Sequence, residues 1–256
     1  MALQASKAKV SALIKDTPAE IYIRWAWKRL KGIPIPLDNV RNEIYDRQAF
    51  EIMSRVLDED SNGIDVGCHL GSYLRKLFEF APRGTHFAFE PIPPMAAALR
   101  EQFPSVNLFE MALSDKVGSA EFFYFLDKPA LSGLARRNDV TSGAQAERID
   151  VRVAPLDSLI PAHTPIHFMK IDVEGAEGLV LSGAKDLIGR DRPFILFEHG
   201  RNSSAHFGWT SEALFDFLTA QCGLKVSRVE DWLNEKSPLT KLEFAKPGGW
   251  YFLAHP

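Results

Sequence analysis

Glycines and acidic residues stand where two short apolar runs of this sequence end. Asp65, Gly67 and Gly71 lie in or just after the run 64–66, and Glu90 ends the next run, 25 residues beyond Asp65. Gly67 permits a sharp turn and Gly71 lets a helix begin close to a ligand, while free amides at a helix N-terminus suit a carboxylate. Asp65 could accept a hydrogen bond from an amino group or order the loop, and Glu90 is placed to accept both hydroxyls of a ribose. The pattern predicts a site for a nucleotide-type ligand.

Two kinds of nucleotide cofactor could use such a turn. A nicotinamide site needs Gly-x-Gly-x-x-Gly, which wraps a pyrophosphate, but position 69 is His and no third glycine completes that pattern. A methionine-sulfonium cofactor has no phosphate and tolerates the looser turn. The sequence therefore favours the sulfonium cofactor.

The elements that must position these residues alternate between apolar strands and helices. This order predicts a parallel α/β sheet with right-handed crossovers. Strands are expected over 64–66, 86–90, 106–113 (with its exit loop), 167–172, 194–198, 224–229 and 249–254, with helices after Gly71, over 94–103 and over 211–222. In open α/β sheets a ligand binds outside the carboxyl ends of the strands. The residues expected there are Asp65, Gly67, Gly71, Glu90, Ser114, Asp172 and Glu198.

The stretch between the third and fourth expected strands departs from this rhythm. Residues 120–125 and 149–153 have the pattern of two added strands, which flank a polar loop over 126–148. Loops of this length within a compact domain are usually functional or disordered. We expect the loop to form a lid on the acceptor side, with disorder of its middle as the open alternative.

The segment before the sheet is expected to be helical. Helices are predicted over 19–31, where a glycine and two prolines then follow, and over 41–57. We therefore predict an N-terminal helical cap, residues 1–60, followed by a cofactor-binding domain, residues 61–256.

Composition sets limits on the function. The hydrophobic fraction of 46% and charged fraction of 25% are ordinary for a globular protein, and a net charge of −3 gives no reason to expect a nucleic-acid partner. Cys68 and Cys222 form no disulfide framework or zinc spacing and suit a reducing compartment. No run approaches the roughly 18 apolar residues of a membrane span, and residues 1–15 lack the apolar run of a secretory signal. We expect a cytoplasmic protein without an integral membrane segment.

Four segments together resemble one family. They are Ile64-Asp65-Val66-Gly67-Cys68-His69-Leu70-Gly71-Ser72, Phe89-Glu90-Pro91, Ala112-Leu113-Ser114-Asp115 and Lys170-Ile171-Asp172-Val173-Glu174-Gly175-Ala176-Glu177. In this order they resemble the FkbM-type methyltransferases, over roughly residues 40–256. The resemblance implies a class I methyltransferase fold, which is Rossmann-like, with seven mostly parallel strands and an antiparallel last strand. Here the fold would carry a helical N-terminal extension and a hairpin or loop insertion.

The resemblance also implies the cofactor and the residues that bind it. The cofactor is S-adenosylmethionine, and the family commonly methylates a hydroxyl oxygen of a sugar or natural product. Ala112 and Leu113 would line the adenine edge, Asp172 would face the methionine end, and Cys68 stands where the family often has a smaller residue. The full predicted cofactor-binding set is Asp65, Gly67, Cys68, His69, Gly71, Glu90, Pro91, Ala112, Leu113, Ser114 and Asp172.

Methyl transfer to an alcohol requires alignment of two atoms, exclusion of water and one group to take the hydroxyl proton. Asp172, Glu174 and His199 are the candidate catalytic residues, because they end the fourth and fifth expected strands. Each has a plainer alternative: Asp172 could position cofactor or acceptor, Glu174 could cap a helix beginning at Gly175, and His199 could cap a strand end or contact a backbone carbonyl.

A metal site is not predicted. Asp172, Glu174, Glu198 and His199 could form an oxygen-rich set of the kind that Mg²⁺ accepts. Nothing in the sequence fixes the geometry of such ligands, so the set does not establish a site.

The sequence thus predicts an S-adenosylmethionine-dependent methyltransferase that acts on a hydroxyl of a sugar, glycolipid or natural product, with a small-molecule or glycan acceptor. An RNA or protein methyltransferase of the same fold and a non-catalytic cofactor-binding module are the alternatives. The lack of a basic stripe counts against RNA, and the intact glycine, Glu90 and Asp172 positions count against the module. The sequence predicts neither the identity of the acceptor nor the oligomeric state.

Overall fold

The computed structural model describes residues 26, 30, 37–135, 146–248 and 250–256. Its strands are β1 (Gly63–Val66), β2 (His86–Phe89), β3 (Asn107–Phe109), β4 (Ala112–Leu113), β5 (Gly118–Phe125), β6 (Ala146–Ala154), β7 (Phe168–Ile171), β8 (Phe194–Glu198), β9 (Lys225–Arg228) and β10 (Tyr251–His255). Its helices are α3 (Leu37–Val56), α4 (Ser72–Phe80), α5 (Pro93–Gln102), α6 (Glu177–Ser182), α7 (Lys185–Asp191), α8 (Arg201–Ala205), α9 (Ser211–Asp216), α10 (Val229–Leu233) and α11 (Lys241–Phe244), with the short helical turns η1 (Pro129–Leu131), η2 (Leu156–Ser158) and η3 (Phe217–Gln221).

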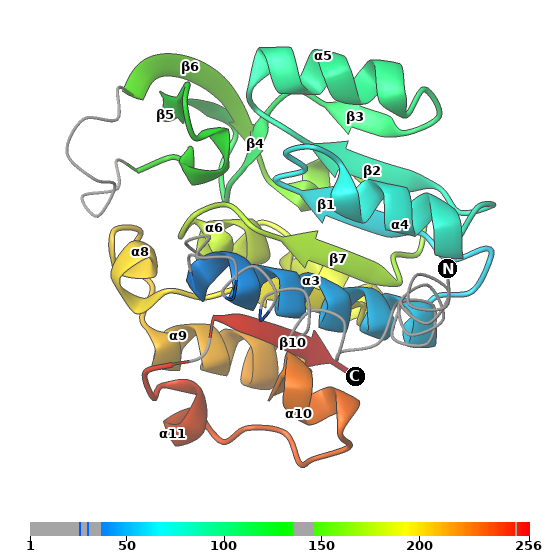
Figure 1. The fold of residues 1–256 in the computed structure, drawn as a ribbon, viewed down its shortest axis with the longest axis vertical. Coiled ribbons are helices and arrows are strands. Elements are labelled where there is room, and N and C mark those ends of the chain that lie inside the picture. The colour runs from blue at the N-terminus through cyan, green and yellow to red at the C-terminus, as the bar shows by residue number, and fades with distance from the viewer. Residues whose placement is uncertain (1–25, 27–29, 31–36, 136–145, 249) are drawn as a thin grey trace. The chain divides into compact units, whose positions relative to one another are not determined.

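The main sheet has seven strands in the order β3-β2-β1-β7-β8-β10-β9 (Figure 1). Its neighbours from β3 to β8 pair in parallel, whereas β10 is antiparallel to both β8 and β9. The sheet is therefore mostly parallel with an antiparallel last strand. This arrangement confirms the class I methyltransferase fold predicted from the sequence.

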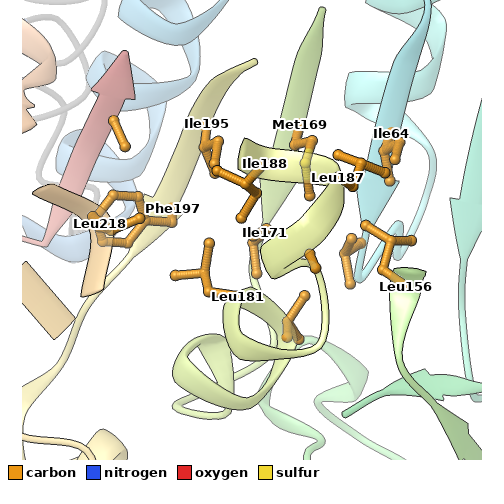
Figure 2. Close-up of a cluster of buried hydrophobic side chains, with 14 of the residues drawn as sticks. Ile64, Leu156, Met169, Ile171, Leu181, Leu187, Ile188, Ile195, Phe197 and Leu218 are labelled. Atoms are coloured by element: carbon orange, nitrogen blue, oxygen red, sulfur yellow. The ribbon is translucent and has the colours of Figure 1, made fainter. Parts of the chain in front are cut away.

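The mostly apolar residues of the central strands explain why these strands lie inside the sheet. Every position of β1, β2 and β7 is buried, as expected for parallel strands that helices cover on both faces. Helix α4 packs on β1 and β2, α5 on β3, and α10 on β9 and β10 (Figure 1). Figure 2 shows the core between the strands and α6 and α7, with Ile64, Met169, Ile171, Ile195 and Phe197 from the strands and Leu181, Leu187 and Ile188 from the helices.

A second sheet, in the order β4-β6-β5, forms the insertion after β3. Strands β5 and β6 pair antiparallel along their lengths, which confirms the two added strands expected from the sequence, and β4 pairs with β6 in parallel. The second sheet has a small core of its own, with Phe122, Val151 and Val153 packed against Ile92 just before α5.

The segment 106–113 holds the third strand, β3, as expected, but its exit contains a second short strand in place of a plain loop. Pairing with β2 ends at Phe109, whose carbonyl accepts a hydrogen bond from the amide of Glu90. The chain then turns, and 112–113 pair with β6 in the second sheet. Ser114 consequently follows a strand of the second sheet and not a strand of the main sheet.

The chain divides into two compact units, Met1–Glu51 and Ile52–Pro256. The helix predicted over 19–31 lies outside the described residues except for positions 26 and 30, as does the middle of the predicted lid, residues 136–145. The helix predicted over 41–57 corresponds to α3. Within the described part of the chain, every helix is too short or too polar to cross a membrane. The boundary between a helical cap and the cofactor-binding domain stays a prediction.

Candidate active site

The ends of neighbouring strands bring the predicted residues to one edge of the main sheet. The last residue of β1 pairs with the last residues of β2 and β7, so Gly67, Glu90 and Asp172 follow at the same level. Glu198 ends β8, and Tyr251, the first residue of the antiparallel β10, pairs with it. Five residues that lie far apart in sequence therefore share this carboxyl edge.

The turn after β1 requires glycine at two positions. Gly67 has a φ of +75°, and a Cβ atom there would lie 2.0 Å from the backbone oxygen of Asp172. Gly71, with a φ of +72°, precedes α4, and its Cβ would lie 2.6 Å from the ring of Phe103. These positive φ values and close approaches exclude larger side chains. His69, between them, also has a positive φ of 49°.

Glu90 braces this turn from the neighbouring strand. Its side chain is buried, with Oε2 accepting from the amide of His69 at 3.0 Å and Oε1 accepting from the amide of Ile92 at 3.0 Å. Burial raises the pKa of the Glu90 carboxyl to about 7, although both amides favour its ionised form. Each carboxylate oxygen has a second lone pair that these amides leave unused.

Asp65 is fully buried in β1, and neither carboxylate oxygen has a hydrogen-bond donor among the described residues. The Lys170 ammonium lies 3.7 Å from Oδ1, beyond hydrogen-bonding distance. Burial raises the pKa of Asp65 above its ordinary value, and the charge of Lys170 is the main effect that opposes that rise. A buried carboxylate without a donor is costly, which marks Asp65 as a group prepared for a further partner.

Cys68 and His69 form the middle of the turn. The Cys68 thiol is buried and donates to the carbonyl of Asp65 at 3.2 Å, and burial raises the pKa of the thiol well above its usual range. Burial, reinforced by Lys170, lowers the pKa of His69. The Cys68 side chain therefore stays a neutral thiol that packs inside the turn.

Lys170 lies at the centre of the edge although it sits in the buried strand β7. Its ammonium donates to the carbonyl of Gly67 at 2.8 Å and lies 3.4 Å from Oδ2 of Asp172. It also lies 5.1 Å from the ring centroid of Tyr73, a cation–π distance. Burial disfavours its charge, but Asp172 and Asp65 outweigh burial and hold the pKa of Lys170 above its ordinary value. Lys170 stays a cation at neutral pH.

Asp172 is the more accessible carboxylate of this group, with a side chain that is 26% exposed. Its Oδ2 receives a hydrogen bond from the hydroxyl of Tyr251 at 3.4 Å in addition to its contact with Lys170. Oδ1 has no such contact among the described residues. The carboxylate is thus held through one oxygen and presents the other.

The loop between β7 and α6 carries Glu174 in a left-handed conformation, with a φ of 57°. Helix α6 begins at Glu177, so the possible role of Glu174 as a cap of a helix beginning at Gly175 is wrong. Buried Glu177 instead accepts from the amides of Val173 at 3.3 Å and Gly175 at 3.0 Å, and burial raises the pKa of Glu177 to about 7. A Cβ on Gly133 of the insertion would lie 3.3 Å from Cβ of Glu174. The insertion therefore reaches this loop.

His199 is placed differently from Asp172. Its ring is buried, with Nε2 2.8 Å from the hydroxyl of Ser211 and Nδ1 3.1 Å from the hydroxyl of Ser204. The ring also stacks on Phe244 with centroids 5.2 Å apart. Serine hydroxyls occupy both ring nitrogens, so the arrangement gives His199 a packing role.

The remaining predicted cofactor residues lie beside the second sheet. Ala112 and Leu113 form β4 and are buried, as is Ser114, whose amide donates to the carbonyl of Ala154 at 3.1 Å. Pro91 follows Glu90 and is half-buried. Strand β4 therefore contributes two buried apolar side chains, and Ser114 contributes a buried polar one.

Comparison with known proteins decides the family. The sequence profile of the "Methyltransferase FkbM domain" matches residues 65–235, more than half of the 256-residue chain. The chain belongs to the FkbM methyltransferase family. It is therefore an S-adenosylmethionine-dependent methyltransferase of FkbM type, as the sequence resemblance predicted.

Two curated relatives match this FkbM chain. The 2-O-methyltransferase NoeI of Sinorhizobium fredii is 31% identical over 190 residues, which cover 66% of this chain and 75% of NoeI. The AMB antimetabolite synthetase AmbE of Pseudomonas aeruginosa is 28% identical over 245 residues, which cover 81% of this chain. The match spans only 11% of AmbE. Among solved structures, the FkbM methyltransferase of Methylobacillus flagellatus shares 13% identity with a TM-score of 0.47, covering 86% of this chain and 60% of that protein.

The residues at the carboxyl edge fit S-adenosylmethionine. The two unpartnered oxygens of Asp65 suit an ammonium group, and the unused lone pairs of Glu90 suit two hydroxyls. The N-terminus of α4, next to Gly71, suits a carboxylate. Within the described residues, no group of three or more His, Cys, Asp or Glu side chains is arranged to hold a metal ion.

Three contributors to this edge are absent from the sequence predictions. Lys170 carried a detectable signal, because a lysine in the middle of an otherwise apolar strand must find compensating charges when buried. Glu177 ends the segment 170–177 that carries the family resemblance, yet no site role was predicted for it, and Tyr251 carried no signal. Tyr251 sits in an aromatic run typical of any core strand, and a glutamate at the start of a helix is normally a surface residue.

Proposed function

We propose that this FkbM methyltransferase methylates a hydroxyl oxygen of a sugar, glycolipid or natural product, and so takes a small-molecule or glycan acceptor. The observation that carries the proposal is the partly exposed Asp172, held through Oδ2 and open at Oδ1 beside the Gly67 turn. An alcohol needs a proton acceptor at the site of methylation, and this carboxylate offers one. The similarity to NoeI, a 2-O-methyltransferase, supports the same class of acceptor.

The cofactor side of the proposal assigns a role to each buried carboxylate. Glu90 accepts hydrogen bonds from the two ribose hydroxyls while His69 and Ile92 keep it in place. Asp65 balances the ammonium of the methionine portion, and the N-terminus of α4 after Gly71 receives its carboxylate. The adenine is bordered by Ala112, Leu113, Ser114 and Pro91, and Cys68 packs behind the turn.

On the acceptor side, the residues of the chain align a hydroxyl and remove its proton. The bound cofactor would supply a methyl group on a positively charged sulfur, which would leave as the neutral thioether of S-adenosylhomocysteine. Asp172 orients the acceptor hydroxyl through Oδ1 and takes its proton, while Lys170 and Tyr251 hold Oδ2 still. Glu174 is the second candidate, because it projects from the same loop next to the insertion. His199 is left out of the proposal because both of its ring nitrogens are engaged.

A transfer assay with tritiated-methyl S-adenosylmethionine tests the proposal. A panel of monosaccharide glycosides, glycolipids and polyhydroxylated natural products is the acceptor pool, with total RNA and denatured protein as comparison pools. The proposal predicts label in the hydroxyl panel, as an ether that resists mild alkali, whereas a methyl ester would be hydrolysed. Label confined to RNA or protein, or an alkali-labile product, contradicts it.

Asp172→Asn tests the assignment of the base in the same assay. Loss of a proton acceptor lowers kcat by about 10²–10⁴-fold, while affinity for S-adenosylhomocysteine changes little because Glu90 and Asp65 are intact. Asp186→Asn, at an exposed position at the start of α7, is the matched control and should keep full activity. An unchanged kcat in Asp172→Asn would transfer the role to Glu174.

A further inference from the structure

A single buried ammonium joins the two halves of the proposed site. Lys170 is 5% exposed and lies in the middle of β7, opposite Asp65 in the parallel register of β1 and β7. Burying a lysine is costly unless its charge and its three N–H groups find partners. A strand residue whose only purpose was packing would be apolar, as its neighbours Met169 and Ile171 are. The partners of Lys170 therefore explain why a cation stands here.

Those partners come from both sides of the site. The carbonyl of Gly67, which accepts from Lys170 at 2.8 Å, belongs to the cofactor turn, and Asp65 lies beside it at 3.7 Å. Asp172, at 3.4 Å, belongs to the acceptor edge. The ring of Tyr73, on α4, covers the ammonium. The Lys170 ammonium thus contacts two groups. One is the backbone of the cofactor turn, and the other is the carboxylate proposed to face the acceptor.

We propose that Lys170 is a positioning residue that couples the cofactor turn at Gly67 to Asp172, so that cofactor binding and placement of the proton acceptor depend on one ammonium group. The proposal rests on the methyl-transfer function proposed above. Lys170 moves no proton itself. It acts by fixing the distance between the Gly67 carbonyl and Oδ2 of Asp172, and by balancing two carboxylates that would otherwise repel each other across the turn.

Removal of the ammonium has a specific consequence. In Lys170→Met the Gly67 carbonyl loses its donor, and Asp65 and Asp172 lose the cation between them. Both the turn and Asp172 are then free to move. Affinity for the cofactor and turnover should fall together, unlike in Asp172→Asn, where turnover falls alone.

A double-mutant cycle separates coupling from general damage. Lys170→Met, Asp172→Asn and the double variant are compared for S-adenosylhomocysteine binding by calorimetry and for kcat with an acceptor that the wild type methylates. We expect Lys170→Met to weaken binding at least about 10-fold and to lower kcat about 100-fold, and the double variant to lose at most about threefold more kcat than the worse single variant. Lys185→Met, an exposed lysine at the start of α7, is the control and should match the wild type.

Two results of this cycle would overturn the proposal. One is a Lys170→Met variant that binds and turns over within threefold of the wild type. The other is kcat losses that multiply in the double variant, since residues that act independently show additive free energies. If the wild type binds no cofactor or methylates no acceptor, the proposed function fails; if it does both and the losses multiply, only the role of Lys170 fails.

A second measurement covers the case in which Lys170→Met does not fold. Protein labelled with ¹⁵N at the lysine side chains should show one slowly exchanging ammonium signal, because Lys170 is the one buried lysine within the described residues. That signal should shift both on addition of S-adenosylhomocysteine and in Asp172→Asn. A signal that stays unchanged in both experiments contradicts the coupling.

Discussion

Replacing Glu177 with Gln should stabilise the protein, and the gain should grow as the pH rises. Glu177 is 1% exposed, its Oε1 accepts the amides of Val173 and Gly175, and its Oε2 has no donor among the described residues. A glutamine keeps the accepting oxygen and removes the charge. The variant therefore isolates the cost of ionising a buried carboxyl that holds the loop after β7.

The size of the effect follows from the pKa of this carboxyl. Burial raises the pKa of Glu177 to about 7 from an ordinary value of 4.5. Between these values the folded state binds more protons than the unfolded state, so the free energy of unfolding of the wild type falls as the pH rises, and the full penalty is present above about pH 7. At 1.36 kcal/mol per pKa unit, the penalty grows by roughly 2–3 kcal/mol between pH 5 and pH 8. Glu177→Gln avoids this growth.

Urea unfolding of the wild type and Glu177→Gln at pH 5, 6, 7 and 8, followed by circular dichroism, measures the difference directly. The stability advantage of the variant should be small at pH 5 and should reach roughly 2–3 kcal/mol more at pH 8. Glu101→Gln, at an exposed position near the end of α5, is the control and should show a difference that does not change with pH. A constant difference between the wild type and Glu177→Gln, or one that shrinks as the pH rises, refutes the reasoning.

Three further predictions concern the site itself. Burial raises the pKa of Glu90 to about 7, and only the ionised carboxylate accepts two hydroxyls. Affinity for S-adenosylhomocysteine should therefore be about tenfold weaker at pH 6 than at pH 8. Calorimetry at the two pH values should show this difference in the wild type and not in Glu90→Gln. Gly67→Ala would place Cβ 2.0 Å from the backbone oxygen of Asp172 at a φ of +75°, and should lower the thermal midpoint and abolish cofactor binding; normal binding by a normally folded variant would show that the turn relaxes without cost. Gly133→Val should push the insertion away from Glu174, since even an added Cβ would lie 3.3 Å from Cβ of Glu174. The acceptor KM should therefore rise several-fold while S-adenosylhomocysteine affinity holds; an unchanged KM would remove the insertion from the acceptor side.

The order of the elements could be predicted from sequence because each central strand is a short apolar run followed by a polar residue. The run 64–66 is fully buried and the run 194–198 is buried at its three middle positions, and a short, mostly apolar run of this kind is typical of a parallel strand. The same pattern located Gly67, Glu90 and Asp172, because parallel strands end at one edge. The register of the paired strands, which aligns those residues at the edge, follows from the three-dimensional fold and not from the hydrophobic pattern of the sequence.

The contacts within the edge could not be predicted. The segment 106–113, expected to hold a strand and its exit loop, contributes to two sheets because pairing with β2 stops at Phe109, and no residue type marks that point. His199 follows a strand end as Asp172 does, yet its ring turns into the core against Phe244. Side-chain direction after a strand depends on tertiary packing, which periodicity does not encode. Glu177 shows the same limit, since its sequence position gives no sign of burial.

Calorimetric titration of S-adenosylhomocysteine into the wild type and Glu90→Ala measures whether the ribose of the cofactor binds to Glu90 at the carboxyl edge. Two hydrogen bonds to a charged acceptor contribute about 1.5–3 kcal/mol each, so the account predicts binding by the wild type and a loss of at least about 100-fold in Glu90→Ala. Glu101→Ala should bind as the wild type does. A wild type that does not bind, or a Glu90→Ala affinity within about twofold of the wild type, would contradict the account.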